Sequence, residues 1–152
     1  MSKATVKSHG IYLETFFGTA EVGLFSVVTE RICLVPPQLK PRQKKLIRDV
    51  LEVEVIPTTI AGSILLSAFA TGNSNGLILS NLILEEELDV IKKHVVDMNL
   101  AVVEGRYTAI GNLVLANDKA ALVSDILPRS AMKAIKDALG VEVVAGRIAD
   151  RS

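Results

Sequence analysis

The sequence contains no tryptophan, one cysteine and two histidines. Aromatic residues make up only 4% of it, so valine, isoleucine, leucine and alanine must fill any core, and a hydrophobic content of 49% is enough for them to do so. The single cysteine, Cys33, excludes an internal disulfide and is typical of a cytoplasmic protein. Residues 1–10 carry Lys3, Lys7 and His9 without an apolar segment, so we expect no signal peptide.

The sequence also lacks an excess of charge of either sign. Lys and Arg total 17, as do Asp and Glu, which argues against broad, charge-driven binding to nucleic acid or to a membrane. The longest stretch without a charged residue, 55–84, is interrupted by Pro57 and by the turn-forming segment 72–76. Since a membrane-spanning helix needs about 20 apolar residues, this stretch predicts two buried strands joined by a turn.

What the sequence does have is a repeat with a period of 44 residues. Segments 29–35, 73–79 and 117–123 align in this frame, and the second and third begin with Asn-rich, turn-forming residues that lead into an apolar run. In the same frame three isoleucines coincide, namely Ile47, Ile91 and Ile135. The pattern indicates one supersecondary unit in several copies, which must bury their apolar faces against one another.

Each copy is typical of a strand, a turn, a strand, a helix and a third strand. In the third copy, Ser130 is expected to cap a helix that ends at Gly140. In the second copy, residues 63–71 predict a strand and Asn75-Gly76 predicts the hairpin turn. The helix of the second copy is expected to begin at the glutamates 85–87 and to bury Leu88, Ile91, Val95 and Val96.

The first copy follows the same order. Residues 23–28 predict its first strand, and residues 10–17 predict one more strand upstream. Pro41 is expected to open its helix. The apolar residues of that helix are Leu46, Ile47, Val50 and Leu51. We therefore predict a single α+β repeat domain over residues 1–152, with units at about 10–56, 57–107 and 108–146, followed by the start of a fourth unit.

The joins between units also resemble each other. Segments 59–63 and 108–112 align at a spacing of 49 residues, because the second unit is five residues longer after its helix. One interpretation is a tight turn that needs glycine at a positive dihedral angle. The other is a rim of small polar residues that serves as a flat docking surface, with Ser63 and Asn112 at matching places.

Residues suited to catalysis or metal binding are sparse. Cys33 lies in an apolar strand, which predicts a buried and inert thiol, and His94 lies on a helix, where we expect a histidine at the core boundary. Two histidines and one cysteine do not make a zinc site of usual composition. No Walker or dinucleotide-binding pattern is present, so no cofactor is expected.

Several ordered segments resemble the archaeal and eukaryotic translation initiation factor six family, the ribosome anti-association factors. The resemblance covers about residues 10–151. The segments that carry it are Thr59-Ile60-Ala61-Gly62, Gly72-Asn73, Asn75 to Leu79, Ala109 to Asn112, Asn117-Asp118, Ala120 to Val123 and Leu139 to Val143.

The resemblance implies a pentein-like fold, in which five such units surround a pseudo-fivefold axis. About three of the five units are recognisable here, and the C-terminal part of the family pattern has no counterpart. It also implies a non-catalytic, cytoplasmic role in protein biosynthesis: binding to the large ribosomal subunit near the sarcin-ricin loop and a neighbouring ribosomal protein, which blocks joining of the small subunit. Asn112 matches a family position on the ribosome-facing side. The predicted ribosome-binding residues are Asn112, Gly111, Ser63, Thr108 and Thr59.

Three alternatives remain open on the sequence. A module of the same fold could serve protein–protein assembly without contacting the ribosome. The pentein fold also hosts guanidine-modifying enzymes, which would require a reactive Cys33. Exposed unit faces could also lead to self-association.

Overall fold

The structure, a computed structural model, describes residues 11–147. Residues 1–10 and 148–152, which hold the predicted leader and most of the predicted start of a fourth unit, lie outside the described residues. The helices are η1 (Val22–Leu24), α1 (Pro41–Leu51), α2 (Leu66–Phe69), α3 (Glu85–His94), η2 (Ile110–Asn112) and α4 (Arg129–Leu139). The strands are β1 (Val27–Val28), β2 (Ile32–Val35), β3 (Glu54–Pro57), β4 (Ala70–Gly72), β5 (Gly76–Ser80), β6 (Asn99–Val103), β7 (Val114–Ala116), β8 (Ala120–Ser124) and β9 (Glu142–Gly146).

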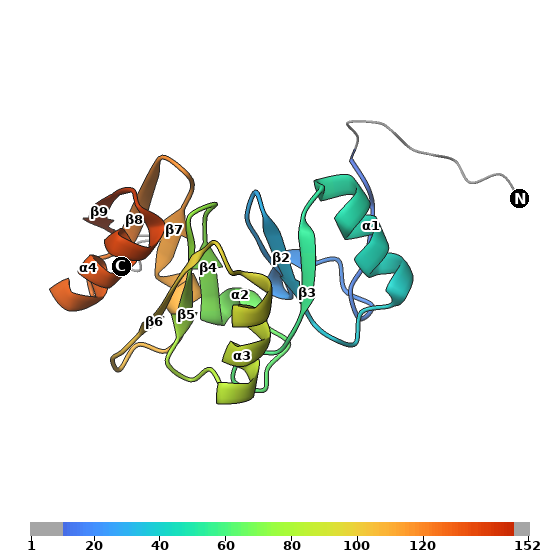
Figure 1. The fold of residues 1–152 in the computed structure, drawn as a ribbon, viewed down its shortest axis with the longest axis horizontal. Coiled ribbons are helices and arrows are strands. Elements are labelled where there is room, and N and C mark those ends of the chain that lie inside the picture. Colours follow the sequence, from blue (N-terminus) through green and yellow to red (C-terminus); the bar gives the residue numbers. More distant parts are fainter. Residues whose placement is uncertain (1–10, 148–152) are drawn as a thin grey trace, which may run out of the picture.

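These strands form three sheets with one topology, in the orders β1-β2-β3, β4-β5-β6 and β7-β8-β9. In each sheet the first two strands form an antiparallel hairpin, and a helix then crosses over to a third strand parallel to the second. The predicted order of strand, turn, strand, helix and strand is confirmed in all three copies. Figure 1 shows the three hairpin turns at one end of the molecule and the joins between copies at the opposite end.

Each copy, or repeat, also begins with a short helical segment that the sequence analysis missed. These segments start at Val22, Leu66 and Ile110, again 44 residues apart. The prediction of strands over 23–28 and 63–71 is therefore wrong except at their ends, where β1 and β4 lie. A short apolar segment does not show whether its residues follow the period of a strand or of a helix. The fully buried Leu66 is therefore compatible with either structure.

Two further boundaries differ from the prediction. Residues 11–17 form no strand, and their only pairing is an isolated bridge between Phe16 and Thr19. Helix α4 begins at Arg129 after the extended Pro128, so Ser130 lies inside the helix and does not cap it. Its end is as expected, because Gly140 adopts the left-handed conformation with φ of 64°.

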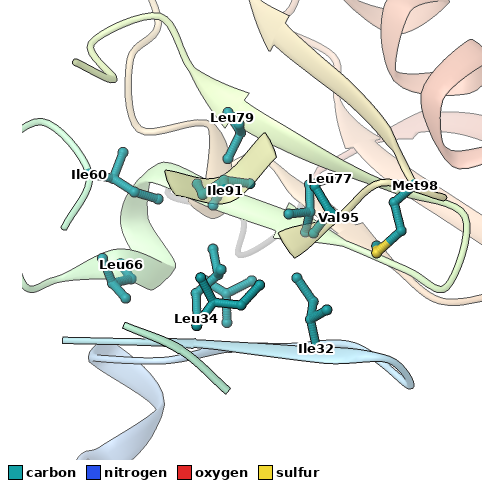
Figure 2. Packing of buried hydrophobic residues seen from close by; sticks show 12 residues of the cluster. Ile32, Leu34, Ile60, Leu66, Leu77, Leu79, Ile91, Val95 and Met98 are labelled. Atoms are coloured by element: carbon teal, nitrogen blue, oxygen red, sulfur yellow. The ribbon is translucent and has the colours of Figure 1, made fainter. Parts of the chain in front are cut away.

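The core forms because each of α3 and α4 lies between two sheets. Alternating residues of a strand point to opposite faces, so Leu77 and Leu79 of β5 meet α3 whereas Ile78 meets α4. Figure 2 shows the first of these clusters, in which Leu34 of the first sheet faces Leu77 and Ile91 of the second repeat. A helix therefore packs on its own sheet and on the sheet of the preceding repeat.

Helix α1 differs because no described repeat precedes it. Leu51, Val95 and Leu139 occupy the same place in successive repeats, yet their exposed fractions are 46%, 4% and 0%. Val50 is also exposed, so the apolar residues of α1 are only partly buried. The predicted burial of Val96 is wrong, because Val96 lies beyond the end of α3 and is 81% exposed.

The uncharged stretch 55–84 contains the end of β3, then α2, β4 and β5. Its interpretation as two strands joined by a turn is correct for β4 and β5 and omits α2. Among residues 11–147, no helix has the length and apolar character needed to cross a membrane.

Candidate functional site

The two joins between repeats lie at one end of the molecule, together with the segments that follow β5 and β8 (Figure 1). We call this the join end, and it comprises residues 57–65, 81–84, 104–113 and 125–128. It contains all five residues that the sequence analysis selected for ribosome binding. The hairpin turns occupy the opposite end, because the second and third strands of every sheet run from the turns towards the joins.

The first join is a tight turn. The backbone N–H of Ser63 donates to the carbonyl of Ile60 at 2.9 Å, and the reverse bond is 3.2 Å. The two central residues, Ala61 and Gly62, have φ values of 56° and 69°. The expectation that Gly62 serves a positive dihedral angle is therefore confirmed. The same geometry recurs 44 residues earlier, where Phe17 and Gly18 have φ values of 53° and 79°.

The carboxylate of Glu87 in α3 holds this turn in place through hydrogen bonds. Its Oε1 accepts the backbone N–H groups of Ala61 at 2.7 Å and Leu84 at 2.9 Å. Its Oε2 accepts the N–H of Gly62 at 3.0 Å and the hydroxyl of Thr59. Burial alone would raise the pKa of Glu87, but the hydrogen bonds from Thr59 and the three backbone groups outweigh it, so the pKa is lowered. The carboxylate thus ties the start of the second repeat to that repeat's own helix.

Replacing Glu87 with glutamine is expected to destabilise the protein by about 2 kcal/mol at neutral pH, because the new amide group would face backbone N–H donors. Since the pKa of Glu87 is lowered in the folded state, the carboxylate contributes fully to the free energy of unfolding above the unfolded-state pKa of about 4.3. The contribution is lost as pH falls through the folded-state pKa. Urea unfolding at several pH values should show the difference between wild type and variant shrinking below that range.

Glu86→Gln is the matched control for this measurement, since Glu86 is the preceding residue and is exposed. It should leave the urea midpoint nearly unchanged at every pH. Equal midpoints for the wild type and Glu87→Gln at neutral pH would contradict the role assigned to Glu87.

The second join is built differently. Gly111 lies within η2 and has no positive φ, so the turn interpretation is wrong at this position. A Cβ atom at Gly111 would lie 1.9 Å from the carbonyl oxygen of Ser67, which shows that the glycine permits close approach of η2 to α2. Asn112 ends η2, whereas Ser63 lies in the turn before α2. The two residues therefore do not occupy matching places, and the alignment at 49 residues does not follow the structural frame.

The five predicted residues differ in whether their side chains are exposed and whether their polar groups already form hydrogen bonds within the protein. The Thr59 hydroxyl is bound to Glu87, and the Ser63 hydroxyl accepts the N–H of Leu65 at 3.0 Å. Thr108 is half-buried, and Gly111 packs against α2. Asn112 is exposed. The structure thus brings the five residues to one end, and among them Asn112 presents an exposed side chain.

The sequence analysis missed the exposed apolar side chains of the join end. Leu82 and Ile126 follow β5 and β8, and both are about half exposed. They are 44 residues apart, so the period of the repeat could have revealed them. Leu65 and Leu84 are exposed at the same end. Scattered single apolar residues are ordinary on a surface, but several at one end are typical of a docking face.

The cysteine and the exposed histidine have no catalytic arrangement. Cys33 is 1% exposed, and burial raises the pKa of its thiol to about 12, which is the opposite of a reactive nucleophile. His94 lies at the surface and pairs with Glu54 at 2.6 Å from Nδ1 to Oε1. Within residues 11–147, no group of three or more His, Cys, Asp or Glu side chains could hold a metal ion.

Comparison with known proteins places this chain in a family. The model of the eIF-6 family matches residues 11–152. The chain belongs to the eIF-6 family. Translation initiation factor 6 of Staphylothermus marinus is 40% identical over 134 residues, which cover 86% of this chain and 58% of that protein.

Two further eIF-6 relatives give the same result. The Pyrococcus horikoshii protein of the same name is 39% identical over 138 residues, which cover 88% of this chain and 61% of that protein. The protein from Methanothermobacter thermautotrophicus is 37% identical over 132 residues, which cover 87% of this chain and 59% of that protein. The names of these relatives are those of a translation factor and not of an enzyme. The chain spans about three fifths of the length of the relatives that it matches.

Proposed function

We propose that this chain acts in translation initiation by binding the large ribosomal subunit and preventing its association with the small subunit. The observation that carries the proposal is the match to the eIF-6 family over nearly the whole chain. The proposed action is steric and non-catalytic, and its place is the cytoplasm. A buried thiol with a raised pKa supports this choice over a guanidine-modifying enzyme.

The proposed docking face is the join end. Asn112 would supply its polar contact, and the half-exposed Leu82 and Ile126 would supply apolar contacts around it. Such a mixture of apolar and polar side chains suits a surface that meets both a ribosomal protein and rRNA near the sarcin-ricin loop. The zero net charge of the chain is consistent with a contact that does not depend on phosphate attraction alone.

We also propose that the three repeats are part of a pentein-like arrangement around a pseudo-fivefold axis, within a single domain. The repeat of one topology in three sheets supports this arrangement. So does contact between the first strands of successive repeats, since β4 touches both β1 and β7. In a five-unit ring, further units would cover the outer faces of α1 and of the third sheet.

Replacing Asn112 with alanine is expected to weaken binding to large ribosomal subunits by about fivefold, because an interface residue of this kind contributes about 1 kcal/mol. The melting temperature should not change, since the side chain is exposed. Co-sedimentation with purified archaeal large subunits on a sucrose gradient measures the binding. A second run with added small subunits measures how many joined ribosomes form.

Lys119→Ala is the matched control, because Lys119 is exposed in a hairpin turn at the opposite end. It should bind like the wild type. If Asn112→Ala binds as well as the wild type, Asn112 is not a contact. If the folded wild-type chain does not sediment with large subunits at all, the proposal fails for this chain, and an assembly module without ribosome binding becomes the better hypothesis.

A further inference from the structure

The hairpin turn between β4 and β5 ends in Asn75-Gly76, which is the only Asn-Gly pair in the sequence. The other asparagines precede serine, leucine or aspartate. In an Asn-Gly pair the backbone nitrogen of the glycine can attack the side-chain carbonyl carbon of the asparagine, because no Cβ atom obstructs it. The product is a cyclic imide, which water opens to aspartate or isoaspartate. Asn75 is exposed, so water reaches its side chain.

Three asparagine side chains of the second repeat, including that of Asn75, bind the last carbonyl groups of α4. The Nδ2 atoms of Asn73 and Asn75 donate to the carbonyl oxygen of Leu139 at 2.9 and 2.8 Å. The Nδ2 atom of Asn99 donates to the carbonyl oxygen of Ala138 at 3.0 Å. We call these three asparagines the amide clasp. Because a helix leaves its last carbonyl groups without partners of its own, the amide clasp holds the end of α4 on the second repeat.

The same contacts restrain the atoms that would react. The N–H of Gly76 donates to Oδ1 of Asn73 at 3.1 Å, while the side chain of Asn75 is held on α4. Gly76 is buried, and a Cβ atom there would lie 2.4 Å from the carbonyl oxygen of Ala138, so its backbone has no room to move while α4 is docked. Attack requires the nitrogen of Gly76 to lose its proton and the side chain of Asn75 to turn towards it. The docked end of α4 opposes both changes.

The reaction needs no reactant other than water. The Gly76 nitrogen forms a bond to Cγ of Asn75, and its proton leaves with the Nδ2 group, which departs as ammonia. Water then adds to one of the two imide carbonyl groups and breaks its C–N bond, which leaves a carboxylic acid whose proton passes to the released ammonia. In sum, water is consumed and ammonia is released, with no oxidation or reduction.

The product does not fit the amide clasp. A carboxylate at position 75 would present an acceptor to the carbonyl oxygen of Leu139, which is also an acceptor, at the negative end of the α4 dipole. Isoaspartate would in addition lengthen the backbone by a methylene group next to the buried Gly76. The modification therefore weakens the docking of α4 on the second repeat, and hydrolysis does not restore the amide.

We propose that Asn75 is a modification site, at which the docked end of α4 suppresses spontaneous deamidation and at which deamidation, once it has taken place, loosens the third repeat. The reaction thus records irreversibly that the second and third repeats have separated. Both sides of this contact lie within the described residues. The proposal is independent of ribosome binding, since the chemistry requires no partner molecule.

The rates of deamidation in the folded and in the urea-unfolded chain test whether docking suppresses the reaction. Both samples are kept at the same pH and temperature. Mass spectrometry with peptide mapping measures conversion at Asn75, and labelling by an isoaspartyl methyltransferase measures isoaspartate. We expect the folded chain to react about 100-fold more slowly, because the reaction requires the third repeat to open. Equal rates in the two samples would overturn the proposal.

Two valine substitutions show whether opening of the third repeat sets the rate. Val123 and Val35 occupy the same place in the third and first repeats, and both are fully buried. Val123→Ala is expected to raise the rate in the folded chain about tenfold, because it loosens the third repeat. Val35→Ala is the matched control and should leave the rate nearly unchanged. An equal rate increase in both variants, or none in Val123→Ala, would contradict the proposal.

Asn75→Asp carries the charge of the product and tests whether deamidation loosens the third repeat. Hydrogen exchange of the α4 amide groups measures the docking of that helix. We expect these groups to exchange about tenfold faster in Asn75→Asp than in the wild type, and less so in Asn75→Ala, which loses the hydrogen bond without adding a charge. Equal protection of α4 in Asn75→Asp and the wild type would overturn this part of the proposal. Circular dichroism confirms that each variant is folded.

Discussion

Replacing Ile91 with aspartate is expected to unfold most of the protein at room temperature. Ile91 is fully buried between the first two sheets, in the cluster of Figure 2. An aspartate there would either keep an unpaired charge in the core or take up a proton at a large cost, and it would also lose the packing of the isoleucine. The expected loss is about 5 kcal/mol, which is comparable to the whole stability of a small domain.

Thermal and urea unfolding followed by circular dichroism would measure this loss. Val96→Asp is the matched control, because Val96 lies just beyond the same helix and is 81% exposed. Its unfolding free energy should change by no more than about 0.5 kcal/mol. A folded Ile91→Asp variant with a melting temperature close to that of the wild type would show that α3 does not pack between the two sheets.

Replacing Gly111 with alanine is expected to cost about 3 kcal/mol. The new Cβ would lie 1.9 Å from the carbonyl oxygen of Ser67 and 2.8 Å from that of Ala70. Both are backbone atoms, so relief requires η2 to move away from α2, which separates the second repeat from the third. The urea midpoint should therefore fall while the slope of the transition remains similar.

Gly23→Ala is a control at the same place in the first repeat. Gly23 is the middle residue of η1, as Gly111 is of η2, but a Cβ atom there would meet nothing within 4 Å. We expect this variant to be unchanged or slightly more stable, since alanine restricts the unfolded chain. Equal destabilisation by both substitutions would mean that backbone preference, and not the close contact with α2, explains the glycine at position 111.

Much of this architecture could be predicted because the chain repeats itself. Where one copy was ambiguous, the other two could help, as for the helices around Ile47, Ile91 and Ile135. The sequence analysis missed helix α2 because the corresponding segment is short and apolar in every copy. Comparing the copies therefore could not show whether its apolar residues follow the period of a helix or of a strand.

The remaining errors arise from information that a sequence pattern does not hold. Leu51 has the spacing of a buried residue, yet its burial depends on a neighbouring surface that the described residues do not contain. The run Glu85 to Glu87 is ordinary for the start of a helix, and only the three-dimensional structure shows that Glu87 receives four hydrogen bonds. The similarity of segments 59–63 and 108–112 comes from shared small residues and not from shared positions in the repeat.

The position of α3 and of α4 between two sheets has a consequence for how the described residues open to solvent. Every repeat gains stability from its neighbours, so the free energy of the whole resembles a sum of intrinsic and nearest-neighbour contributions. Among residues 11–147, the middle repeat has a neighbour on both sides, whereas the first and third have one each. Opening should therefore begin at the outer repeats, and the hydrogen bonds of β5, whose residues are all buried, should be among the last to exchange with solvent. Residues 11–147 thus resemble a short cooperative series of repeats, in which the strongest protection from exchange is expected at the centre and the weakest at the two ends.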